Sequence, residues 1–425
     1  MLSAFLKYLH SLPKSCPTFK FVIVTGNESC DLDSIACATC YAYIKSKEDP
    51  DKEVIYIPYC NIPESDIDLR TEATFWLRNC QIDKKDLFYA GSLNWLLGPE
   101  YAKELSLILV DHFQKEPSNA FVFCPVSEII DHHPLLPDYR KPGTCQFFLV
   151  EKVGSCSSLL VHELFNRISP ALIPPELCRL LYGAILIDTD GLSERAVEIQ
   201  KATQKDVEAV RKLETFAGMA LHTVGTTRTS IYAAILEAKF CIDGLSLWDL
   251  LRRDCKKVIA DSDSHTDIVC STITGMDFKE LLDRDDFNQE AARFCEEQNA
   301  RVLVCVTVGL ASLPSRDHCL DQPSSMPLSK KFHRGVVVTA PVRYRNLMNS
   351  VKDAIFILSF NIMLWAHLLA NAKDFLVGYP LGGELSHHSS VGEVETGVYV
   401  ARITDEAVTR KQLIPLLIDF LRSQK

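Results

Sequence analysis

Short apolar segments that end in acidic residues recur through the first half of the chain. Phe21 to Val24 is followed by the pair Asp31 and Asp33, and Ile129-Ile130 is followed directly by Asp131. Each segment is typical of a buried strand that ends in a turn. Open α/β sheets bind their ligands beyond the carboxyl ends of the strands. The pattern therefore predicts an α/β protein that carries its chemistry at one edge of a sheet.

The first half also alternates strand-like with helix-like segments. Apolar runs at Val54 to Ile57 and Leu105 to Val110 are separated by helical stretches such as Ser34 to Lys47. This alternation predicts βαβ units, that is, a mainly parallel sheet with flanking helices. A further helix is expected over Ser155 to Arg167, where the first hydroxyls would cap the helix. The free N–H groups at its start would alternatively face a phosphate or orient the active-site loops. Leu180 to Ile187 is compatible with a strand or a helix, because periodicity alone does not separate the two.

The length of the chain predicts two domains, because 425 residues exceed the size at which single hydrophobic cores stop growing. We expect a first domain over residues 1–220, a hinge linker over 221–232, and a smaller α/β domain over 233–425. Strands of the second domain are predicted at Ile268 to Ile273 and Val302 to Val308.

Composition and charge exclude some classes of function. A formal charge of −10 opposes a general nucleic-acid-binding role, because such binding needs clustered Lys and Arg. Sixteen irregularly spaced cysteines fit cytosolic thiols better than a disulfide framework, which predicts a cytoplasmic protein. Met1 to Lys20 faintly resembles a transit peptide, so a mitochondrial or other organelle pool is the alternative.

Two segments could indicate a zinc site or a membrane span, but a simpler structure is expected for each. Cys37 and Cys40 form a C-x-x-C, but nothing completes a thiolate zinc site, so both are expected in the core of a helix. Ala354 to Ala370 is an uncharged apolar run that is short for a membrane span. A strand followed by a buried helix is expected there, and no membrane association is predicted.

Four aspartates and one histidine follow apolar runs and could converge on one site. They are Asp31, Asp33, Asp111, Asp188 and His132. Together they supply enough ligands for two cations that share a bridging carboxylate. Because oxygens outnumber nitrogens, the set favours Mn²⁺, Mg²⁺ or Co²⁺ over structural zinc. One aspartate after a strand is usually a cap or turn former, but D-x-D, D-H and D-H-H together predict a metal-dependent phosphoesterase.

Taken together, the motifs resemble the DHH phosphoesterase superfamily. The similar segments are Gly26 to Ser34, Val110-Asp111, Asp131 to His133, Gly154 to Ser158 and Gly183 to Thr189. Within it, the chain resembles most closely the exopolyphosphatase and prune branch, which joins a DHH domain to a DHH-associated C-terminal domain. The resemblance continues through Ala238 to Phe240 and Thr409 to Pro415, so it spans most of the chain. It implies an active site in the cleft between the two domains.

The resemblance implies two metal sites. Asp111 would bridge the two cations, and Asp31 would bind the first of them. The ligands of the second cation would be Asp33, His132 and Asp188. His133 would face the substrate as a phosphate ligand or general acid, so Asp111 and His133 are the predicted catalytic pair.

The resemblance also implies a set of substrate-binding residues. Lys239, Arg410 and Lys411 would hold phosphate oxygens, and Arg70 is a further cation at a matching position. Asn27 is counted with them, although a turn residue after Gly26 is its ordinary role. The related inorganic pyrophosphatases carry His where this chain has Asn27. Loss of that imidazole would weaken the first metal site and shift preference away from pyrophosphate.

These expectations describe an exopolyphosphatase, a hydrolase that releases orthophosphate from the end of inorganic polyphosphate. One alternative is a phosphodiesterase for cyclic nucleotides or short oligonucleotides, which would need an aromatic platform for the base. Another is a prune-like interaction protein with residual short-chain polyphosphatase activity, against which the retained His133 counts. Polyphosphate is the expected partner, with no stable nucleic-acid partner. The oligomeric state is left open, and a monomer is compatible with the sequence.

Overall fold

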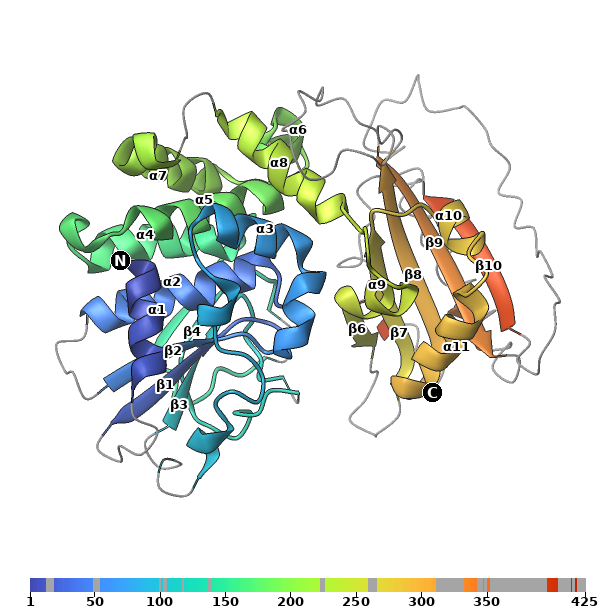
Figure 1. Ribbon diagram of the computed structural model, residues 1–425, viewed down its shortest axis with the longest axis horizontal. Coiled ribbons are helices and arrows are strands. Elements are labelled where there is room, and N and C mark those ends of the chain that lie inside the picture. Colours follow the sequence, from blue (N-terminus) through green and yellow to red (C-terminus); the bar gives the residue numbers. More distant parts are fainter. Residues whose placement is uncertain are drawn as a thin grey trace. The chain divides into compact units, whose positions relative to one another are not determined.

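The computed structural model folds into two compact units, Met1–Lys239 and Phe240–Lys425 (Figure 1). It describes residues 1–12, 19–48, 54–98, 101, 105–116, 118–135, 139–221, 226–258, 266–310, 332–341, 347, 350–351, 396–403, 414 and 417–418.

The first unit is built on a five-stranded sheet in which every pairing is parallel. Its strands in chain order are β1 (Lys20–Thr25), β2 (Val54–Tyr59), β3 (Leu105–Val110), β4 (Val126–Asp131) and β5 (Phe147–Val150). They lie in the order β2-β1-β3-β4-β5. The order reverses between β1 and β3, and in doubly wound folds ligands bind beyond the strand ends at this switch point.

Helices cover the first sheet and complete one hydrophobic core. They are α1 (Leu2–Ser11), α2 (Leu32–Glu48), α3 (Thr71–Asn79), α4 (Cys156–Arg167), α5 (Pro175–Asp188), α6 (Glu194–Glu198), α7 (Gln204–Leu221) and α8 (Arg228–Phe240), with short 3₁₀ turns η1 (Glu64–Leu69), η2 (Lys84–Asp86), η3 (Asn94–Leu97), η4 (Pro170–Leu172) and η5 (Asp190–Leu192). Helix α2 packs on β1, β2 and β3 and also against α4 and α5, and α7 packs on α4 and α5 (Figure 1). The start of α2 is thereby set between the sheet and α4.

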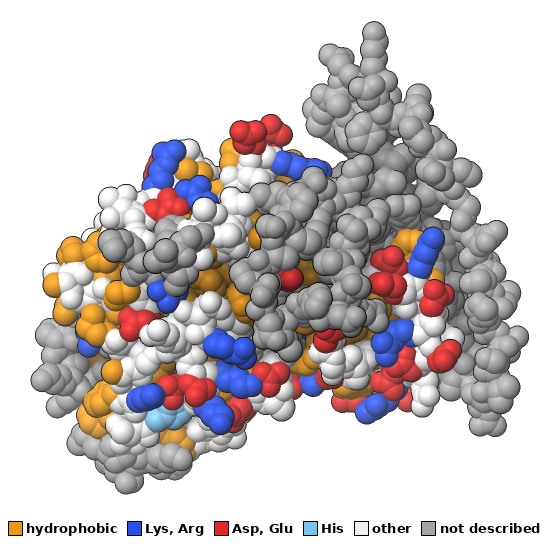
Figure 2. Space-filling model, turned by 45° about the horizontal axis from the view of Figure 1, so that its top comes forward, with side chains coloured by type: hydrophobic (Ala, Val, Ile, Leu, Met, Phe, Trp, Pro, Cys, Tyr) orange, Lys and Arg blue, Asp and Glu red, His pale blue; other side chains and the backbone are white. Residues whose placement is uncertain are grey.

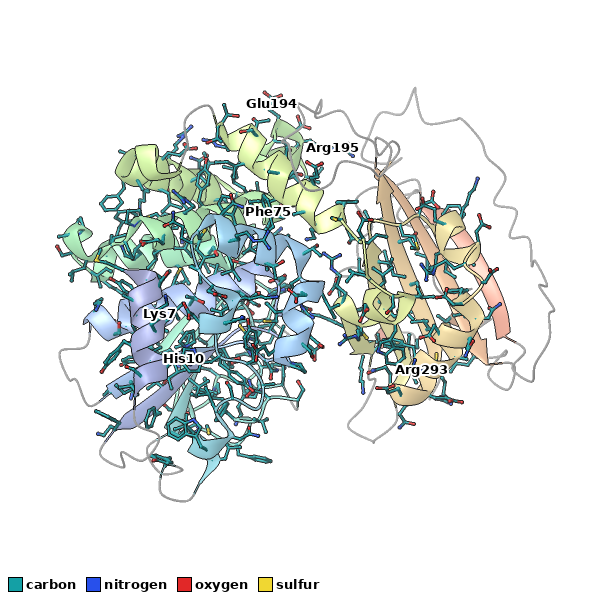
Figure 3. All side chains as sticks on the ribbon, in the orientation of Figure 1. Lys7, His10, Phe75, Glu194, Arg195 and Arg293 are labelled. Carbon is teal, nitrogen blue, oxygen red and sulfur yellow. The ribbon has the colours of Figure 1, made fainter. Side chains whose placement is uncertain are left out.

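Helix α1 is part of this core. Leu2, Leu6 and Leu9 are buried. His10, which Figure 3 labels on this helix, stacks on Phe88 with ring centroids 4.1 Å apart. The amphipathic spacing of the leucines explains why this helix lies along the domain surface with one face inward.

The second unit holds a mixed five-stranded sheet in the order β10-β9-β8-β7-β6. Its elements are α9 (Leu247–Arg253), β6 (Cys255–Val258), β7 (Thr266–Thr274), α10 (Phe278–Leu282), α11 (Phe287–Glu297), β8 (Ala300–Leu310), β9 (Phe332–Pro341) and β10 (Thr396–Ile403). Strands β7 and β8 are parallel and the other pairings are antiparallel. Helices α9 and α11 cover one face, and a separate apolar cluster lies on the other (Figure 1).

The structure confirms the predicted α/β class, with a parallel sheet in the larger N-terminal unit and a smaller α/β unit after it. It also decides the ambiguous segment Leu180 to Ile187, which is helical as part of α5. Cys37 and Cys40 are fully buried on α2, as expected for core residues. Helix α8 already begins at Arg228, inside the expected linker 221–232.

Some expectations fall on residues that lie outside the described part of the chain. These are the apolar segment 354–370 and the basic pair Arg410-Lys411. Among the described helices, none is both long and apolar enough to cross a membrane. On the face shown in Figure 2, Lys and Arg side chains are interspersed with Asp and Glu rather than gathered into one basic surface.

Candidate metal centre

The register of the first sheet brings three turns together. Thr25 of β1 pairs with Leu109 of β3, and Val110 pairs with Ile130 of β4. Continued past the strand ends, this register sets Asn27 beside Asp111 and Asp111 beside Asp131. Parallel strands that end level with one another therefore place the D-x-D, D-H and D-H-H turns at one edge of the sheet, beside the switch point.

The turn after β1 is tightly built. A Cβ on Gly26 would lie 2.5 Å from the Cβ of Ser34, so only glycine allows the chain to cross the start of α2 here. Asn27 Oδ1 accepts the backbone N–H groups of Ser29 (2.9 Å) and Cys30 (3.3 Å), which closes an Asx turn. Because its oxygen is engaged in this way, Asn27 turns its Nδ2 toward Asp111 Oδ2, at 2.8 Å.

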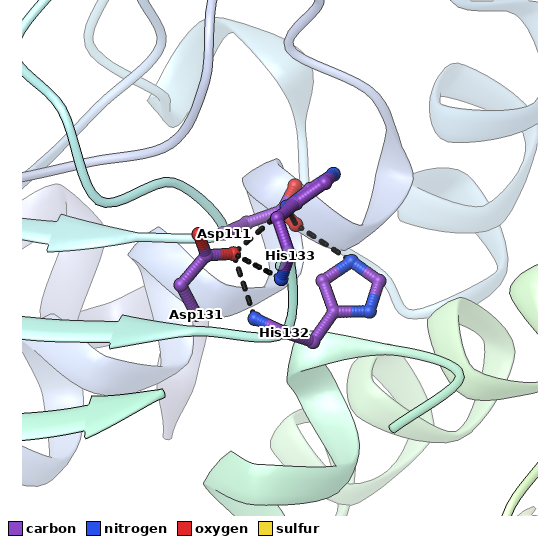
Figure 4. A group of neighbouring side chains, drawn as sticks. All are labelled: Asp111, Asp131, His132 and His133. Carbon is purple, nitrogen blue, oxygen red and sulfur yellow. Dashed lines mark hydrogen bonds and ion pairs between the residues drawn. The ribbon is translucent and has the colours of Figure 1, made fainter. Parts of the chain in front are cut away.

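Asp111 lies at the centre of the site and is almost fully buried. Its Oδ2 accepts hydrogen bonds from Asn27 Nδ2 and from the hydroxyl of Ser34, the latter at 2.7 Å. Its Oδ1 has no hydrogen-bond partner, although it lies 3.2 Å from Nε2 of His132 (Figure 4). Burial alone would raise the pKa of Asp111. In their protonated forms the adjoining imidazoles of His132 and His133, with the Ser34 hydroxyl, outweigh burial and hold the pKa of Asp111 well below its usual range.

His132 presents a lone pair to that unpaired oxygen. Its Nδ1 lies 3.0 Å from the carbonyl oxygen of Val153, which can only accept, so Nδ1 carries the proton. In a neutral imidazole Nε2 is then an acceptor, and it faces Asp111 Oδ1, which is also an acceptor. A cation between the two atoms would satisfy both. Histidines that bind metals usually donate their other N–H to a carbonyl or carboxylate in this way.

Asp131 and His133 form a second pair in the same turn. Asp131 is fully buried, and its Oδ1 accepts the backbone N–H groups of His132 (2.7 Å) and His133 (3.2 Å). The same oxygen lies 2.8 Å from Nδ1 of His133 and so orients that ring, as Figure 4 shows. Within the described chain, Asp111, Asp131, His132 and His133 have ligand atoms that all lie within 4.8 Å of one another. Asp131 was not among the residues predicted to act. The sequence did contain a sign of this role, because Asp131 is the first residue of the D-H-H motif and follows a buried strand.

Asp33 is held by the first turn of α4. Its Oδ1 accepts from the Ser155 hydroxyl (2.9 Å) and from the N–H and hydroxyl of Ser157 (2.9 and 2.5 Å), and its Oδ2 accepts from the N–H of Cys156 (2.7 Å). Free N–H groups at a helix N-terminus favour an anion, here a carboxylate. Ser155 is the N-cap residue, but its side chain makes no capping hydrogen bond. The capping role expected for this hydroxyl is therefore wrong. The free N–H groups of Cys156 and Ser157 instead donate to Asp33 and so hold the turn that follows β1.

Asp31 is a fourth carboxylate of the site, after Asp111, Asp131 and Asp33. Burial, followed by the charges of Asp111 and Asp33, raises its pKa to about 6, while the Ser34 N–H and the charge of Lys239 act in the opposite direction. Three carboxylates therefore lie close enough to repel one another. Lys239, near the end of α8, lies close enough to Asp31 to oppose that repulsion. Such a concentration of oxygen ligands suits a hard divalent cation.

Arg70 supports the turn rather than lying open to it. The side chain is buried, and Nε and Nη2 donate to the carbonyl oxygen of Ser29 at 3.0 and 2.9 Å. Its Nη1 donates to the carbonyl oxygen of Asp66 at 3.2 Å. A guanidinium fixed in this way holds the Asn27–Asp31 turn in place, and its predicted contact with substrate stays a prediction.

Asp188 is the last residue of α5 and is partly buried. It is not one of the four residues whose ligand atoms come together within 4.8 Å. Arg410 and Lys411 lie outside the described residues. The ligand role of Asp188 and the phosphate-binding role of the two basic residues therefore stay predictions.

The comparisons with known proteins agree with the sequence resemblance. The family model named DHH family, N-terminal domain matches residues 21–185, and the DHHA2 domain model matches residues 233–420. A Schizosaccharomyces pombe protein named "Putative exopolyphosphatase" is 30% identical over 345 residues, which cover 76% of this chain and 80% of that protein. Mouse "Exopolyphosphatase PRUNE1" is 33% identical over 286 residues, 67% of this chain. This chain thus belongs to the DHH family, in the exopolyphosphatase and prune branch with a DHHA2 domain.

The chain matches only part of the length of some relatives. The match spans 59% of the length of mouse PRUNE1. A Brevibacillus brevis protein named "Probable manganese-dependent inorganic pyrophosphatase" is 26% identical over 205 residues, 48% of this chain and 57% of that protein.

Proposed function

We propose that this protein is a metal-dependent exopolyphosphatase that hydrolyses the terminal phosphate of inorganic polyphosphate. The observation that carries the proposal is the pair of buried acceptors, Asp111 Oδ1 and His132 Nε2, 3.2 Å apart. Only a cation or a proton relieves that pairing, and the nearby carboxylates of Asp31 and Asp33 favour a divalent ion. The names of the relatives, which include exopolyphosphatases and a manganese-dependent pyrophosphatase, support the same reaction class.

The donor set fits two divalent ions, Mn²⁺, Mg²⁺ or Co²⁺. In the proposed arrangement Asp31 belongs to the first ion and Asp111 is shared by both. The ligands of the second ion are Asp33, His132 and Asp188. Bound there, the ions would activate a water molecule and neutralise charge that develops on the phosphoryl group.

The chain's own groups would do the remaining work. Asp111 accepts hydrogen bonds from Asn27 and Ser34 at Oδ2, which favours its ionised form and leaves Oδ1 for a cation. His133, held at Nδ1 by Asp131, would direct its other ring nitrogen to a phosphate oxygen or the leaving group. Lys239, beside Asp31, would bind phosphate oxygens. By the sequence resemblance, Arg410 and Lys411 are proposed as further phosphate-binding residues.

The geometry of Asn27 supports polyphosphate over pyrophosphate. Its Oδ1 accepts two backbone N–H groups and its Nδ2 donates to Asp111, so the amide offers no free lone pair to a cation. The first ion would then have fewer protein ligands than in an enzyme with His at this position. We also propose a cytoplasmic location, because all cysteines that the structure describes are free thiols.

The deciding experiment incubates the purified protein with pyrophosphate, tripolyphosphate, long polyphosphate and cyclic AMP, each with Mn²⁺, Mg²⁺ or Co²⁺. We expect orthophosphate release chiefly from tripolyphosphate and long polyphosphate. Asp111→Asn should abolish that release. Asp286→Asn, which breaks an exposed ion pair with Arg284, is the matched control and should leave the rate unchanged. Release of product from cyclic AMP alone would replace the proposal by a phosphodiesterase. No turnover with any ion would favour a binding protein.

A further inference from the structure

Asp206 is a buried carboxylate outside every motif discussed so far. It is the third residue of α7, and it is completely buried. Its Oδ2 accepts the N–H and the hydroxyl of Thr203, both at 2.7 Å, which caps the start of α7. The same side chain reaches across to the segment before α4, and capping alone does not require that.

Asp206 makes three hydrogen bonds to the loop and first turn of α4. Its Oδ2 accepts the N–H of Gly154 at 2.8 Å, and its Oδ1 accepts the N–H of Ser155 at 3.3 Å and the hydroxyl of Ser158 at 2.6 Å. A buried carboxylate is costly unless its oxygens are satisfied. Five neutral donors that converge on one carboxylate therefore make a specific and rigid junction between α7 and α4.

The segment that Asp206 holds is the one that orients two proposed metal ligands. On one side of Gly154, the carbonyl oxygen of Val153 accepts from His132 Nδ1 and fixes which nitrogen is protonated. On the other side, Ser155, Cys156 and Ser157 hold Asp33 by four hydrogen bonds of 2.5–2.9 Å. The hydrogen bonds from Gly154 and Ser155 to Asp206 lie between these two sets of contacts.

Close packing leaves the segment little freedom. A Cβ on Gly154 would lie 2.5 Å from Thr189 Cγ2 and 2.6 Å from the carbonyl oxygen of Lys201. The glycine is therefore wedged between the 201 turn and the residue that follows Asp188. A segment clamped on both faces transmits the position of Asp206 to its neighbours rather than absorbing a shift.

We propose that Asp206 is a positioning residue that sets the metal-binding geometry of Asp33 and His132 through the Val153–Ser157 segment. The inference rests on the proposed function only in taking these two side chains as metal ligands. Partners behind metal ligands typically change affinity by about 10- to 100-fold when they are lost. Asp206 contacts the residues that hold the ligands and not the ligands themselves. We therefore expect its loss to weaken metal affinity by the lower end of this range, about tenfold.

The test measures Mn²⁺ binding without substrate, from the electron paramagnetic resonance signal of free Mn²⁺. Asp206→Asn keeps the volume of the side chain. Its amide N–H₂ group, however, faces hydrogen-bond donors in place of one carboxylate oxygen. We expect its Kd for Mn²⁺ to rise about tenfold. Thr203→Ala is the matched control, because it weakens the cap of α7 and leaves the Asp206 bonds to Gly154, Ser155 and Ser158. Its Tm should fall while its Kd stays within about twofold of wild type.

The readouts separate positioning from stability. If Asp206→Asn is folded by circular dichroism and binds Mn²⁺ as wild type does, or if Thr203→Ala raises the Kd as much, the inference is wrong. Saturating Mn²⁺ should restore most of the hydrolysis rate of Asp206→Asn. Should that variant not fold, Ser158→Ala decides, because it removes one hydrogen bond to Oδ1. An unchanged Kd in Ser158→Ala would then overturn the proposal, and a severalfold rise would support it.

Failure of the proposed function would look different. A wild-type protein that binds Mn²⁺ but releases no phosphate from any polyphosphate refutes the exopolyphosphatase and leaves the Asp206 comparison intact. A wild-type protein that binds no Mn²⁺ refutes the ligand assignment, and the role of Asp206 with it.

Discussion

At the scale of single residues, Asp131 shows how one carboxylate can organise a turn and a ring together. One of its oxygens accepts two backbone N–H groups and faces His133 Nδ1. The other is buried and has no hydrogen-bond partner. Two roles follow from this geometry, orientation of His133 by the first oxygen and ligation of a cation by the second. We favour orientation, because the paired oxygen makes three contacts within the D-H-H turn, two with backbone N–H groups and one with His133 Nδ1.

Asp131→Asn distinguishes these roles. The amide oxygen can keep the turn, but the carboxylate charge that faces His133 Nδ1 is lost. We expect kcat for polyphosphate to fall by about 10- to 100-fold, with little change in the Kd for Mn²⁺. The measurement pairs steady-state kinetics with Mn²⁺ titration. A large rise in Kd with an unchanged kcat at saturating metal would instead make Asp131 a ligand.

Asn27 gives a second residue-scale prediction. Asn27→His should raise the rate on pyrophosphate relative to tripolyphosphate, because an imidazole adds a ligand for the first ion. The N–H groups of Ser29 and Cys30 would lose their acceptor, so stability should fall by about 1 kcal/mol. Asn27→Ala is the control, since it also opens the turn but supplies no ligand. If both variants change the ratio of the pyrophosphate rate to the tripolyphosphate rate equally, the added imidazole ligand does not explain the change.

At the scale of elements, the start of α2 collects negative charge that the fold alone does not relieve. The pKa of Asp31 is raised from 3.8 to about 6, chiefly by burial and then by Asp111 and Asp33. A raised folded-state pKa means that the folded state binds more protons than the unfolded state between pH 4 and 6. The contribution of Asp31 to stability is therefore present at low pH and lost as the pH rises through about 6.

Urea unfolding of the metal-free protein tests this sign. We expect Asp31→Asn to gain stability relative to wild type between pH 4 and pH 7, and to lose that advantage when Mn²⁺ is added. Asp286 is the matched opposite, because its hydrogen bond with Arg284 lowers its pKa. Asp286→Asn should therefore be less stable than wild type above about pH 4, and the difference should shrink as the pH falls below 3.8. If the difference in unfolding free energy between Asp31→Asn and wild type does not change with pH, the pKa of Asp31 is not raised in the folded state.

Elements also show what could be predicted from sequence. Strands β2 and β3 are buried along almost their whole length, so they appear as continuous apolar runs, and β3 has the predicted bounds Leu105–Val110. Helix α5 was ambiguous because its buried residues lie on every side and leave no clear period. The anchoring of Asp33 on α4 and of Gly154 on Asp206 joins residues 123 and 52 positions apart. Contacts between residues so far apart in the sequence cannot be predicted from local patterns of apolar and polar residues.

At the scale of the whole molecule, the candidate ligands that the structure describes belong to the unit Met1–Lys239, while the second unit has its own two apolar clusters. An ion that binds the folded state alone stabilises it by an amount set by its concentration relative to Kd. Metal should therefore act on the first unit. Trp76 and Trp95 lie in that unit and Trp248 in the other, which gives each a fluorescent reporter.

A full-length variant with Trp248→Phe and Trp365→Phe would report the first unit only. With Mn²⁺ at 100 times its Kd, we expect the free energy of unfolding seen by this fluorescence to rise by about 2.7 kcal/mol, and a chelator to reverse the rise. The same variant carrying Asp111→Asn is the control and should gain almost nothing, because the shared ligand is missing. A rise of equal size in that control would mean that Mn²⁺ stabilises the unit elsewhere. The carboxylates at the ends of β1 and β3 would then need another explanation for being gathered in one buried place.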